Sequence, residues 1–279
     1  MKVLVTGANG YLGQGIVRKL LDDGVEVVAT DFKVSHIDDR AGKIEADLFA
    51  VEDPYAFFGK PDAVIHLAWK DGFKHNSDAH LEELPKHCRF LKSLVAGGIK
   101  LVSVMGTMHE VGFFEGPISE DTPCNPENLY GIAKNALREF CLSLCRQNKV
   151  TLQWLRGFYI VGNTMYGDSI FSKITKAAME GEKTFPFTSG KNQYDFLDYG
   201  DFCAQVAAAV EQKEVDGIIN ICSGQPESLS SRVERFIASN SYDIKLQYGS
   251  FPDRPYDSKA VWGDDSKIRM ILEEQKRRK

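Results

Sequence analysis

Short apolar runs alternate with longer segments of helical periodicity along the first half of the chain. The runs are too short for helices and predict buried strands at residues 2–6, 25–30, 43–46, 63–67, 100–104 and 150–155. Helices are predicted at 11–22, at 129–147 and in a segment that ends near Gly98. This alternation indicates a parallel sheet covered on both faces. The predicted class is therefore α/β, with a doubly wound parallel sheet of the Rossmann type.

The pattern becomes less regular after about residue 156, and glycine and aromatic residues gather between 157 and 190. Farther on, helices are predicted at 204–210 and 229–238, and a strand is predicted at 217–221. We therefore predict a Rossmann domain at residues 1–156 and a smaller C-terminal α/β lobe at 157–279. Some segments of this lobe are expected to return to the first domain.

Composition and charge narrow the class of protein. The 279 residues are 43% hydrophobic and carry a net charge of −5, so we expect no nucleic-acid partner and read the basic end 276–279 as a solvated tail. No apolar run approaches the roughly 18 residues of a membrane span, and the first residues do not form a signal peptide. The six cysteines contain no CxxC, which favours a reducing, cytoplasmic location.

The six histidines show no metal-ligand spacing, so no metal site is predicted. Three of them, His75, His80 and His87, lie in a polar stretch. We interpret that stretch as a solvated face.

Three glycines follow the first predicted strand at intervals of three and open the first helix. Gly7 allows a tight turn, Gly10 allows backbone N–H groups to approach a pyrophosphate, and Gly13 allows the helix to pack closely on the strand. A helix N-terminus also favours an anion. We predict that this loop binds a dinucleotide. Its other expected contacts are Asn9, Tyr11 and Leu12.

Asp31 ends the second predicted strand. A carboxylate there accepts hydrogen bonds from a ribose diol and repels a 2′-phosphate, so NAD is favoured over NADP as the cofactor. Lys33 lies close enough to weaken that preference. The other reading of these residues is a structural glycine turn beside an exposed aspartate.

The glycine spacing itself is TGxxGxxG, in "TGANGYLG", and not the GxGxxG of the usual dehydrogenases. It resembles the extended short-chain dehydrogenase/reductase family, which includes nucleotide-sugar epimerases, dehydratases and reductases. Within that resemblance, "EADL" places Asp47 and Leu48 at the adenine, and "HLAW" places Leu67 and Ala68 along the cofactor. "FPDRPYDSKAVWGDDSKI" implies that Arg254 clamps the substrate diphosphate, although a surface arginine is the alternative.

Two further segments, "QYDFLDYGDF" and "NICSGQPESLS", extend the resemblance over most of the chain. "LYGIAKNALREF" supplies Tyr130 and Lys134 at the spacing YxxxK, which puts both on one face of a helix. The ammonium is expected to lower the pKa of the phenol from about 10 toward neutrality. The tyrosine could then exchange a proton with a sugar while nicotinamide exchanges a hydride.

The third catalytic position of the family follows the fifth strand. Alignment on Gly112 places Thr107 there, whereas Ser103 lies one turn too early, inside the strand. Dehydratases of the family resemble Thr-Asp-Glu at this point. Here Met108 cannot transfer a proton and Glu110 is one place late, so dehydration is disfavoured.

Besides Arg254, two residues are expected near the substrate. His109 could act as a local acid, although a loop or packing histidine is an equal alternative. Tyr159 stands where the family often has an asparagine, and His87 replaces another common asparagine. These departures leave the pose of the substrate open.

The resemblance implies an NAD(P)-dependent enzyme that transfers a hydride at C4 of a nucleotide sugar. We favour a 4-keto reductase of a nucleotide-linked 6-deoxy-4-ketosugar, because the substrate lobe is short. A 4-epimerase with retained NAD is favoured almost equally, and a sugar or uronate dehydrogenase is a further alternative. A non-catalytic dinucleotide-sensing regulator is disfavoured because Thr107, Tyr130 and Lys134 are all present.

A homodimer is also implied by the resemblance. The helix at 129–147 and the one before the fifth strand resemble the pair through which family members dimerise. Core packing explains their apolar residues equally well. The candidate contacts are Leu91, Leu94, Leu137, Phe140 and Leu144.

Overall fold

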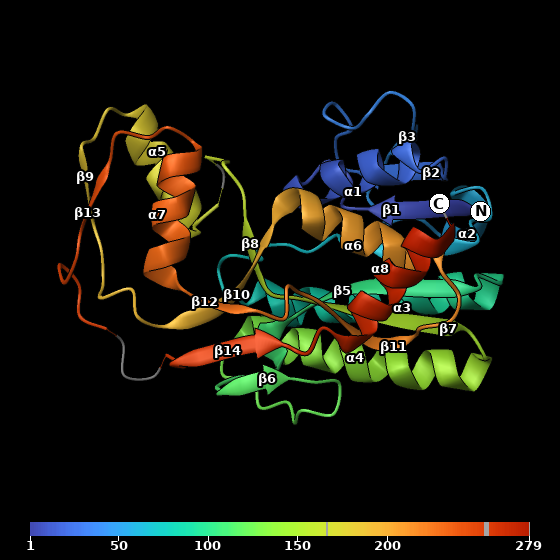
Figure 1. The fold of residues 1–279 in the computed structure, drawn as a ribbon. Coiled ribbons are helices and arrows are strands. Elements are labelled where there is room, and N and C mark those ends of the chain that lie inside the picture. Colours follow the sequence, from blue (N-terminus) through green and yellow to red (C-terminus); the bar gives the residue numbers. More distant parts are fainter. Residues whose placement is uncertain (166, 254–256, 279) are drawn as a thin grey trace.

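Seven parallel strands form the larger of the sheets, in the order β11-β7-β5-β4-β1-β2-β3 (Figure 1). The computed structural model describes residues 1–165, 167–253 and 257–278. The seven strands are β1 (Lys2–Thr6), β2 (Glu26–Asp31), β3 (Gly42–Glu45), β4 (Ala63–His66), β5 (Leu101–Thr107), β7 (Thr151–Gly157) and β11 (Gly217–Ile221). The strand order changes direction between β1 and β4, which is where parallel sheets of this kind bind ligands.

Helices cover both faces of this sheet. One face carries α1 (Tyr11–Asp22), α6 (Tyr199–Glu211) and α8 (Ser266–Arg278), and the other carries α2 (Pro54–Phe57), α3 (Ala79–Gly97) and α4 (Leu129–Asn148). The doubly wound α/β class predicted from the sequence is confirmed. No helix in the described part of the chain is long and apolar enough to cross a bilayer.

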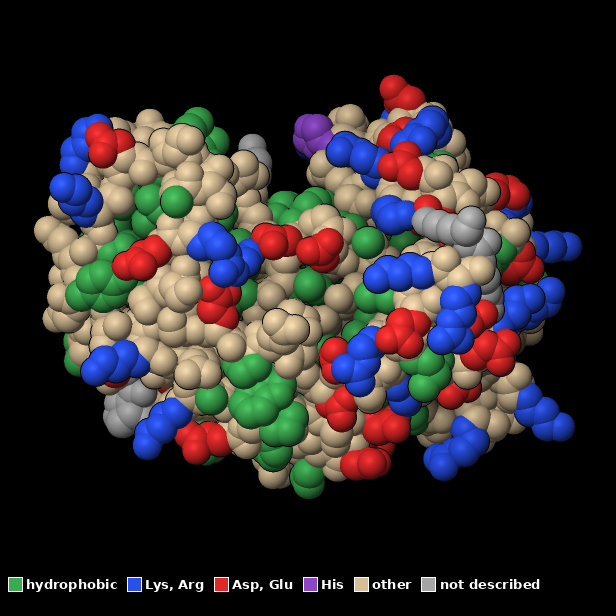
Figure 2. Space-filling model, viewed as in Figure 1, with side chains coloured by type: hydrophobic (Ala, Val, Ile, Leu, Met, Phe, Trp, Pro, Cys, Tyr) green, Lys and Arg blue, Asp and Glu red, His purple; other side chains and the backbone are tan. Residues whose placement is uncertain are grey.

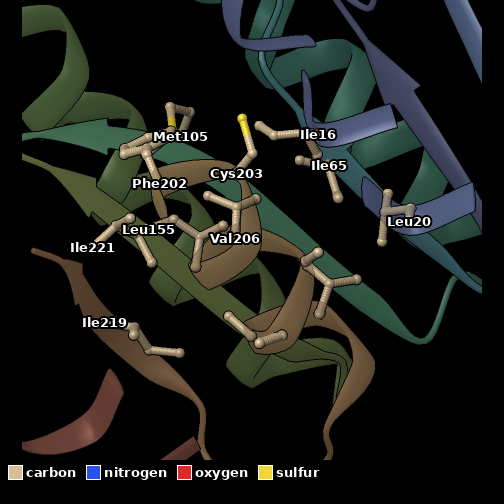
Figure 3. Close-up of a cluster of buried hydrophobic side chains, with 14 of the residues drawn as sticks. Ile16, Leu20, Ile65, Met105, Leu155, Phe202, Cys203, Val206, Ile219 and Ile221 are labelled. Atoms are coloured by element: carbon tan, nitrogen blue, oxygen red, sulfur yellow. The ribbon is translucent and has the colours of Figure 1, made fainter. Parts of the chain in front are cut away.

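The strands are apolar on both faces because both faces are buried. Val3 and Val5 of β1 point into the cluster under α1 and α6, whereas Leu4 between them points into the cluster under α3 and α4. Figure 3 shows how Phe202 and Val206 of α6 pack on the first of these faces. This alternation is the two-residue period of a strand.

The smaller lobe stands beside the C-terminal ends of these strands (Figure 1). Its elements are β8 (Tyr159–Val161), α5 (Ile170–Met179), β9 (Thr184–Pro186), β10 (Gln193–Asp198), β12 (Pro226–Ser228), α7 (Leu229–Ser239) and β13 (Lys245–Gln247). A five-stranded sheet links β8, β10 and β12 to β14 (Ala260–Gly263) and β6 (Gly116–Ile118). A separate pair joins β9 and β13.

Asp195 of β10 connects several segments of this second sheet through hydrogen bonds. Its buried carboxylate accepts hydrogen bonds from the backbone N–H groups of Ser223, Gly224 and Gly263, at 2.7, 2.9 and 3.0 Å. The segment after β11, the strand β10 and the end of β14 therefore meet at one charged side chain. From the C-terminal part of the chain, α6, β11 and α8 pack on the larger sheet. The division into two domains at residue 156 stays a prediction.

β5 runs three residues farther than the sequence pattern predicts. Met105, Gly106 and Thr107 pair with Leu155–Gly157 of β7, so the ladder continues through a glycine that weakens the apolar pattern. A Cβ at Gly106 would lie 2.2 Å from Nε1 of Trp154, so the indole occupies the space that a side chain would need. The extension makes Thr107 the last residue of β5.

Three of the five residues offered as dimer contacts belong to the core of the chain itself. Leu91, Leu94 and Leu137 are fully buried in the cluster under α3 and α4. Phe140 and Leu144 are partly buried and pack against the same cluster. For the first three, core packing is the correct explanation.

A buried ion pair holds the short 3₁₀ turn that follows β5, η1 (Met108–Glu110). Nε of Arg156 donates to the Glu110 carboxylate at 2.5 Å, and Nε1 of Trp154 donates to both carboxylate oxygens at 3.0 and 2.9 Å. Both charged side chains are fully buried. Burial raises the pKa of Glu110, and the guanidinium opposes that rise. Glu110 is therefore a core residue that cannot reach a substrate.

We expect Arg156→Met to lower the free energy of unfolding by about 3–5 kcal/mol, because it leaves the Glu110 carboxylate buried without its counter-charge. The double variant Glu110→Gln, Arg156→Met removes the carboxylate as well and should lose less stability than the single variant. Urea unfolding at pH 7 measures both. A single variant that is as stable as the double variant would contradict this account.

Candidate active site

The glycine loop between β1 and α1 is tightly packed at two positions and less crowded at the third. A Cβ at Gly7, whose φ is +68°, would lie 2.7 Å from the backbone nitrogen of Ala68. A Cβ at Gly13 would lie 2.3 Å from the carbonyl oxygen of Gly7. At Gly10 the nearest atom would be that same oxygen, at 3.2 Å. Gly7 and Gly13 thus serve backbone packing, and the space beside Gly10 remains for a ligand.

Gly10 is the N-cap of α1 and has no side chain to cap the helix. The first N–H groups of a helix have no partner within the helix, so they can bind a pyrophosphate at this end. Asn9 holds the neighbouring loop, because its side-chain carbonyl accepts the N–H of His36 at 2.8 Å. Tyr11 stacks on Tyr199, with ring centroids 4.3 Å apart.

Asp31 lies at the end of β2, directly beside the glycine loop. Its two carboxylate oxygens accept the N–H groups of Asn9 at 3.0 Å and Phe32 at 2.7 Å. The carboxylate is therefore fixed where the ribose of a bound dinucleotide would lie. Asp47 is exposed just after β3, and Leu48 beside it is buried. Helix terminus, open glycine and fixed carboxylate together fit a dinucleotide.

Leu67 and Ala68 lie after β4, on the other side of the glycine loop. The N–H of Leu67 donates to the carbonyl of Thr6 at 3.2 Å, and the N–H of Ala68 donates to the Thr6 hydroxyl at 3.3 Å. Both residues are half-buried. The four cofactor-contact segments expected from the sequence thus end at the same edge of the sheet.

Tyr130 lies in the first turn of α4, packed against η1. Asn128 caps this helix through the N–H of Gly131 at 2.8 Å. A Cβ at Gly131 would lie 2.3 Å from the carbonyl oxygen of His109, so α4 and η1 approach as closely as their backbones allow. The Thr107 hydroxyl lies near the Tyr130 hydroxyl and lowers the pKa of the phenol. The structure therefore brings Thr107, Tyr130 and Lys134 together at the end of β5.

The electrostatics of this group differ from the expectation. Burial raises the pKa of Tyr130 to about 12, with the Thr107 hydroxyl working against the rise. Burial lowers the pKa of Lys134 to about 7. The prediction that the ammonium brings the phenol pKa toward neutrality is wrong for the protein by itself. The reason is the burial of the phenol, which raises its pKa. Lys134 is directed elsewhere: its Nζ donates to the carbonyl of Met105 at 2.8 Å and lies 3.9 Å from the ring centroid of Trp69.

Sequence reasoning missed a cluster of rings around Tyr130. His75 stacks on the phenol at 5.4 Å between centroids, and Trp69 lies 6.2 Å away on another side. His80 and His87 are buried against the indole, so their interpretation as a solvated face is wrong. They lie seven residues apart on α3, on its buried face. That spacing was the signal that could have found them.

The three residues expected near the substrate have different outcomes. The ring of His109 lies 4.4 Å from that of His75 and 6.0 Å from that of Tyr130, so it borders the group that contains Tyr130. Tyr159 packs instead on Tyr194, with centroids 4.7 Å apart, in an aromatic group of the smaller lobe. Burial raises the pKa of Tyr159. Arg254 lies outside the described residues.

A cavity of about 440 Å³ lies at the junction of the lobes, lined by the end of β8, the first turn of α6 and one face of α7. Figure 2 shows the hollow between the lobes on this side of the molecule.

Within the described ranges, no group of three or more His, Cys, Asp or Glu side chains could hold a metal ion.

Comparison with known proteins identifies the class that this fold and site define. The model of the NAD dependent epimerase/dehydratase family matches residues 3–222. A dTDP-6-deoxy-L-talose 4-dehydrogenase (NAD(+)) of Aggregatibacter actinomycetemcomitans is 44% identical over 269 residues, which are 94% of this chain and 99% of the relative. The chain belongs to the NAD dependent epimerase/dehydratase family.

More distant relatives share the fold. A probable UDP-arabinose 4-epimerase of rice (Oryza sativa subsp. japonica) is 26% identical over 97% of this chain and 74% of its own length. The structure of a UDP-glucose 4-epimerase with UDP-glucose from Thermotoga maritima superposes with a TM-score of 0.80 at 20% identity, over 99% of both chains. At that identity the likeness concerns the fold alone.

Lys134 generates a prediction about stability and pH. Its pKa is about 7 in the folded protein and 10.5 ordinarily, so between these values the unfolded chain holds one more proton. Wild type should therefore gain stability relative to Lys134→Met as the pH rises from 7 to 10, at up to about 1.4 kcal/mol per pH unit. Urea unfolding at pH 7, 8 and 9 measures the difference. A constant difference would show that Lys134 keeps its ordinary pKa.

Proposed function

We propose that the protein is an NAD(H)-linked oxidoreductase that interconverts the C4 hydroxyl and the C4 ketone of a nucleotide-linked 6-deoxy sugar. It would act as a 4-keto reductase. The observation that carries this proposal is the 44% identity, over 99% of its length, to a dTDP-6-deoxy-L-talose 4-dehydrogenase. The gathering of Thr107, Tyr130 and Lys134 beside a dinucleotide cradle supports the same chemistry.

The cradle would hold NAD(H), which when bound supplies or accepts the hydride. The first-turn N–H groups of α1, with Gly10, Tyr11 and Leu12, would bind its pyrophosphate. Asp31 would accept the hydroxyls of the adenosine ribose, and Asp47 with Leu48 would border the adenine. Leu67 and Ala68 would lie along the rest of the cofactor.

Tyr130 would be the proton donor in the reducing direction. A phenol whose pKa is about 12 keeps its proton at neutral pH, which suits transfer to a developing alkoxide on C4. The Thr107 hydroxyl would hydrogen-bond the same oxygen and hold the ketone in place. The charged form of Lys134 would stabilise the phenolate that Tyr130 leaves behind. Hydride and proton together convert the ketone to the alcohol.

The substrate would lie between the two lobes. His109 would contact the sugar from η1, and Tyr159 would contact it from β8. Arg254 would pair with the diphosphate of the nucleotide.

A 4-epimerase is the alternative, supported by several relatives of that name. The rice relative is only 26% identical, and this chain covers 74% of it. Such an enzyme would have to keep its NAD and turn the keto sugar between two hydride transfers. A sugar or uronate dehydrogenase would use the same residues.

We also propose a homodimer in the cytoplasm, which sedimentation and fractionation would test.

The assay uses a 4-keto-6-deoxy nucleotide sugar with NADH, followed at 340 nm with the product identified by NMR. We expect one NADH consumed per C4 alcohol formed. Tyr130→Phe should reduce kcat by about 10²–10⁴-fold, because the proton donor is lost. Tyr248→Phe, at an exposed tyrosine of the smaller lobe, is the matched control. Isomer exchange without net NADH consumption would favour the epimerase instead.

Asp31→Ala should weaken NADH binding by about 10–100-fold, since it removes a charged acceptor of the ribose hydroxyls. Binding of NADPH should change less, because the same carboxylate repels a 2′-phosphate. Energy transfer from tryptophan to NADH measures both affinities. Asp39→Ala, at an exposed aspartate of the neighbouring loop, is the control. Equal losses for the two cofactors would show that Asp31 does not read the ribose.

A further inference from the structure

We infer that Trp69 is the positioning residue for Lys134: its indole face holds the ammonium and directs the remaining donor of that group toward the proposed site of proton transfer. The inference rests on the proposed function for its catalytic consequence. The placement of Lys134 by Trp69 rests only on the contacts between the side chains.

The donors of Lys134 can be accounted for one by one. An ammonium has three N–H groups and no acceptor. The carbonyl of Met105 takes one at 2.8 Å, and the face of Trp69 lies 3.9 Å from Nζ, within the range of a strong cation–π contact. The ring of Tyr130 is more distant, at 5.9 Å. One donor is therefore left for the proposed site of proton transfer, and the two contacts fix its direction.

The indole is itself held in one orientation. Its Nε1–H donates to Nδ1 of His80 at 3.0 Å, which fixes that nitrogen as the acceptor. The other nitrogen of His80 then carries the hydrogen and donates to the carbonyl of Lys74 at 3.0 Å. His87 stacks on the indole at 4.5 Å between centroids and 17° between planes. The indole of Trp69 is thus held at one edge by His80 and on one face by His87, independently of its contact with Lys134.

His87 is in turn tied to the central strands. Its Nδ1 hydrogen-bonds with Nε2 of His66 at 2.8 Å, and Nδ1 of His66 hydrogen-bonds with the Thr6 hydroxyl at 2.8 Å. All three side chains are buried. A continuous set of contacts therefore runs from β1 and β4 through the indole to Lys134. An alanine at position 69 would have no aromatic face to contact the ammonium.

The charge on Lys134 depends on the groups that face it. Glu110 from η1 and Cys141 from α4 favour the charged form and raise its pKa, and burial opposes them. His66 and His87 stay neutral because burial lowers their pKa to about 3 and about 2, so they add no competing positive charge near pH 7. The quadrupole of the indole also favours the charged form. Loss of that face should lower the pKa of Lys134.

The direct test is NMR of protein labelled with ¹³C at the lysine Cε, with the Lys134 signal identified by its absence in Lys134→Met. A methylene over an indole face is shifted upfield by the ring current. We expect that upfield shift in wild type and in Trp69→Phe, and its loss in Trp69→Leu. The pKa of Lys134 should fall by about 0.5–1 in Trp69→Leu. Trp262→Leu, at a half-buried tryptophan of β14, should leave the signal unchanged.

Kinetics give the catalytic consequence. We expect Trp69→Leu to lower kcat at least tenfold with KM for the sugar within twofold, and to move the alkaline fall in kcat to lower pH. Trp69→Phe should restore kcat to within about threefold of wild type. A Lys134 signal that is the same in wild type and Trp69→Leu would overturn the inference, as would an unchanged kcat in that variant. Wild type that shows the upfield shift but no C4 turnover would instead overturn the proposed function.

Discussion

The buried pair of Glu110 and Arg156 determines where the catalytic segment lies. Two opposite charges without solvent exposure must stay together, because separating them would leave either one buried and unpaired. Trp154 adds two hydrogen bonds to the same carboxylate. Because Arg156 and Trp154 both belong to β7, this strand fixes the position of η1. Thr107 enters this turn from β5, and His109 lies within it against α4. The pair touches no reacting group, yet the positions of Thr107, His109 and Tyr130 all follow from it.

The cofactor cradle depends on a different constraint, which is backbone proximity. Gly7 and Gly13 have no space for a side chain, whereas a Cβ at Gly10 would meet a single backbone oxygen, at 3.2 Å, so the loop is less crowded on that side. Parallel strands bring this loop, Asp31 and the end of β5 to one edge of the sheet. Contacts run from Thr6 of β1 through His66, His87 and Trp69 to Lys134 of α4. The proposed cofactor cradle and the proposed proton-transfer group are therefore connected by buried side chains.

Local patterns in the sequence predicted the elements whose signals are local. The strand, glycine loop and helix at residues 2–22 were predicted at their observed bounds, because apolar period, turn glycines and helix start coincide there. The end of β5 was missed because pairing with β7, and not composition, carries it through Gly106. The short strands of the smaller lobe were missed because each depends on partners distant in the sequence.

The candidate site divides in the same way. Tyr130 and Lys134 are recognisable from a four-residue spacing, but the environment that raises one pKa and lowers the other comes from burial, which no motif records. His80 and His87 were not recognised because a histidine reads as polar in a sequence, although its ring can pack in a core. Only the fold shows that both rings pack against Trp69 and that the indole of Trp69 lies over Lys134.

The most direct measurement of the central claim is the fate of the hydride. The keto sugar is incubated with NADH carrying deuterium at either face of nicotinamide C4, and the product is examined by NMR. The account predicts one deuterium at C4 of the sugar, from one face only, with one NAD formed per product. Deuterium at another carbon, or product free of deuterium with both labelled forms of NADH, would contradict it.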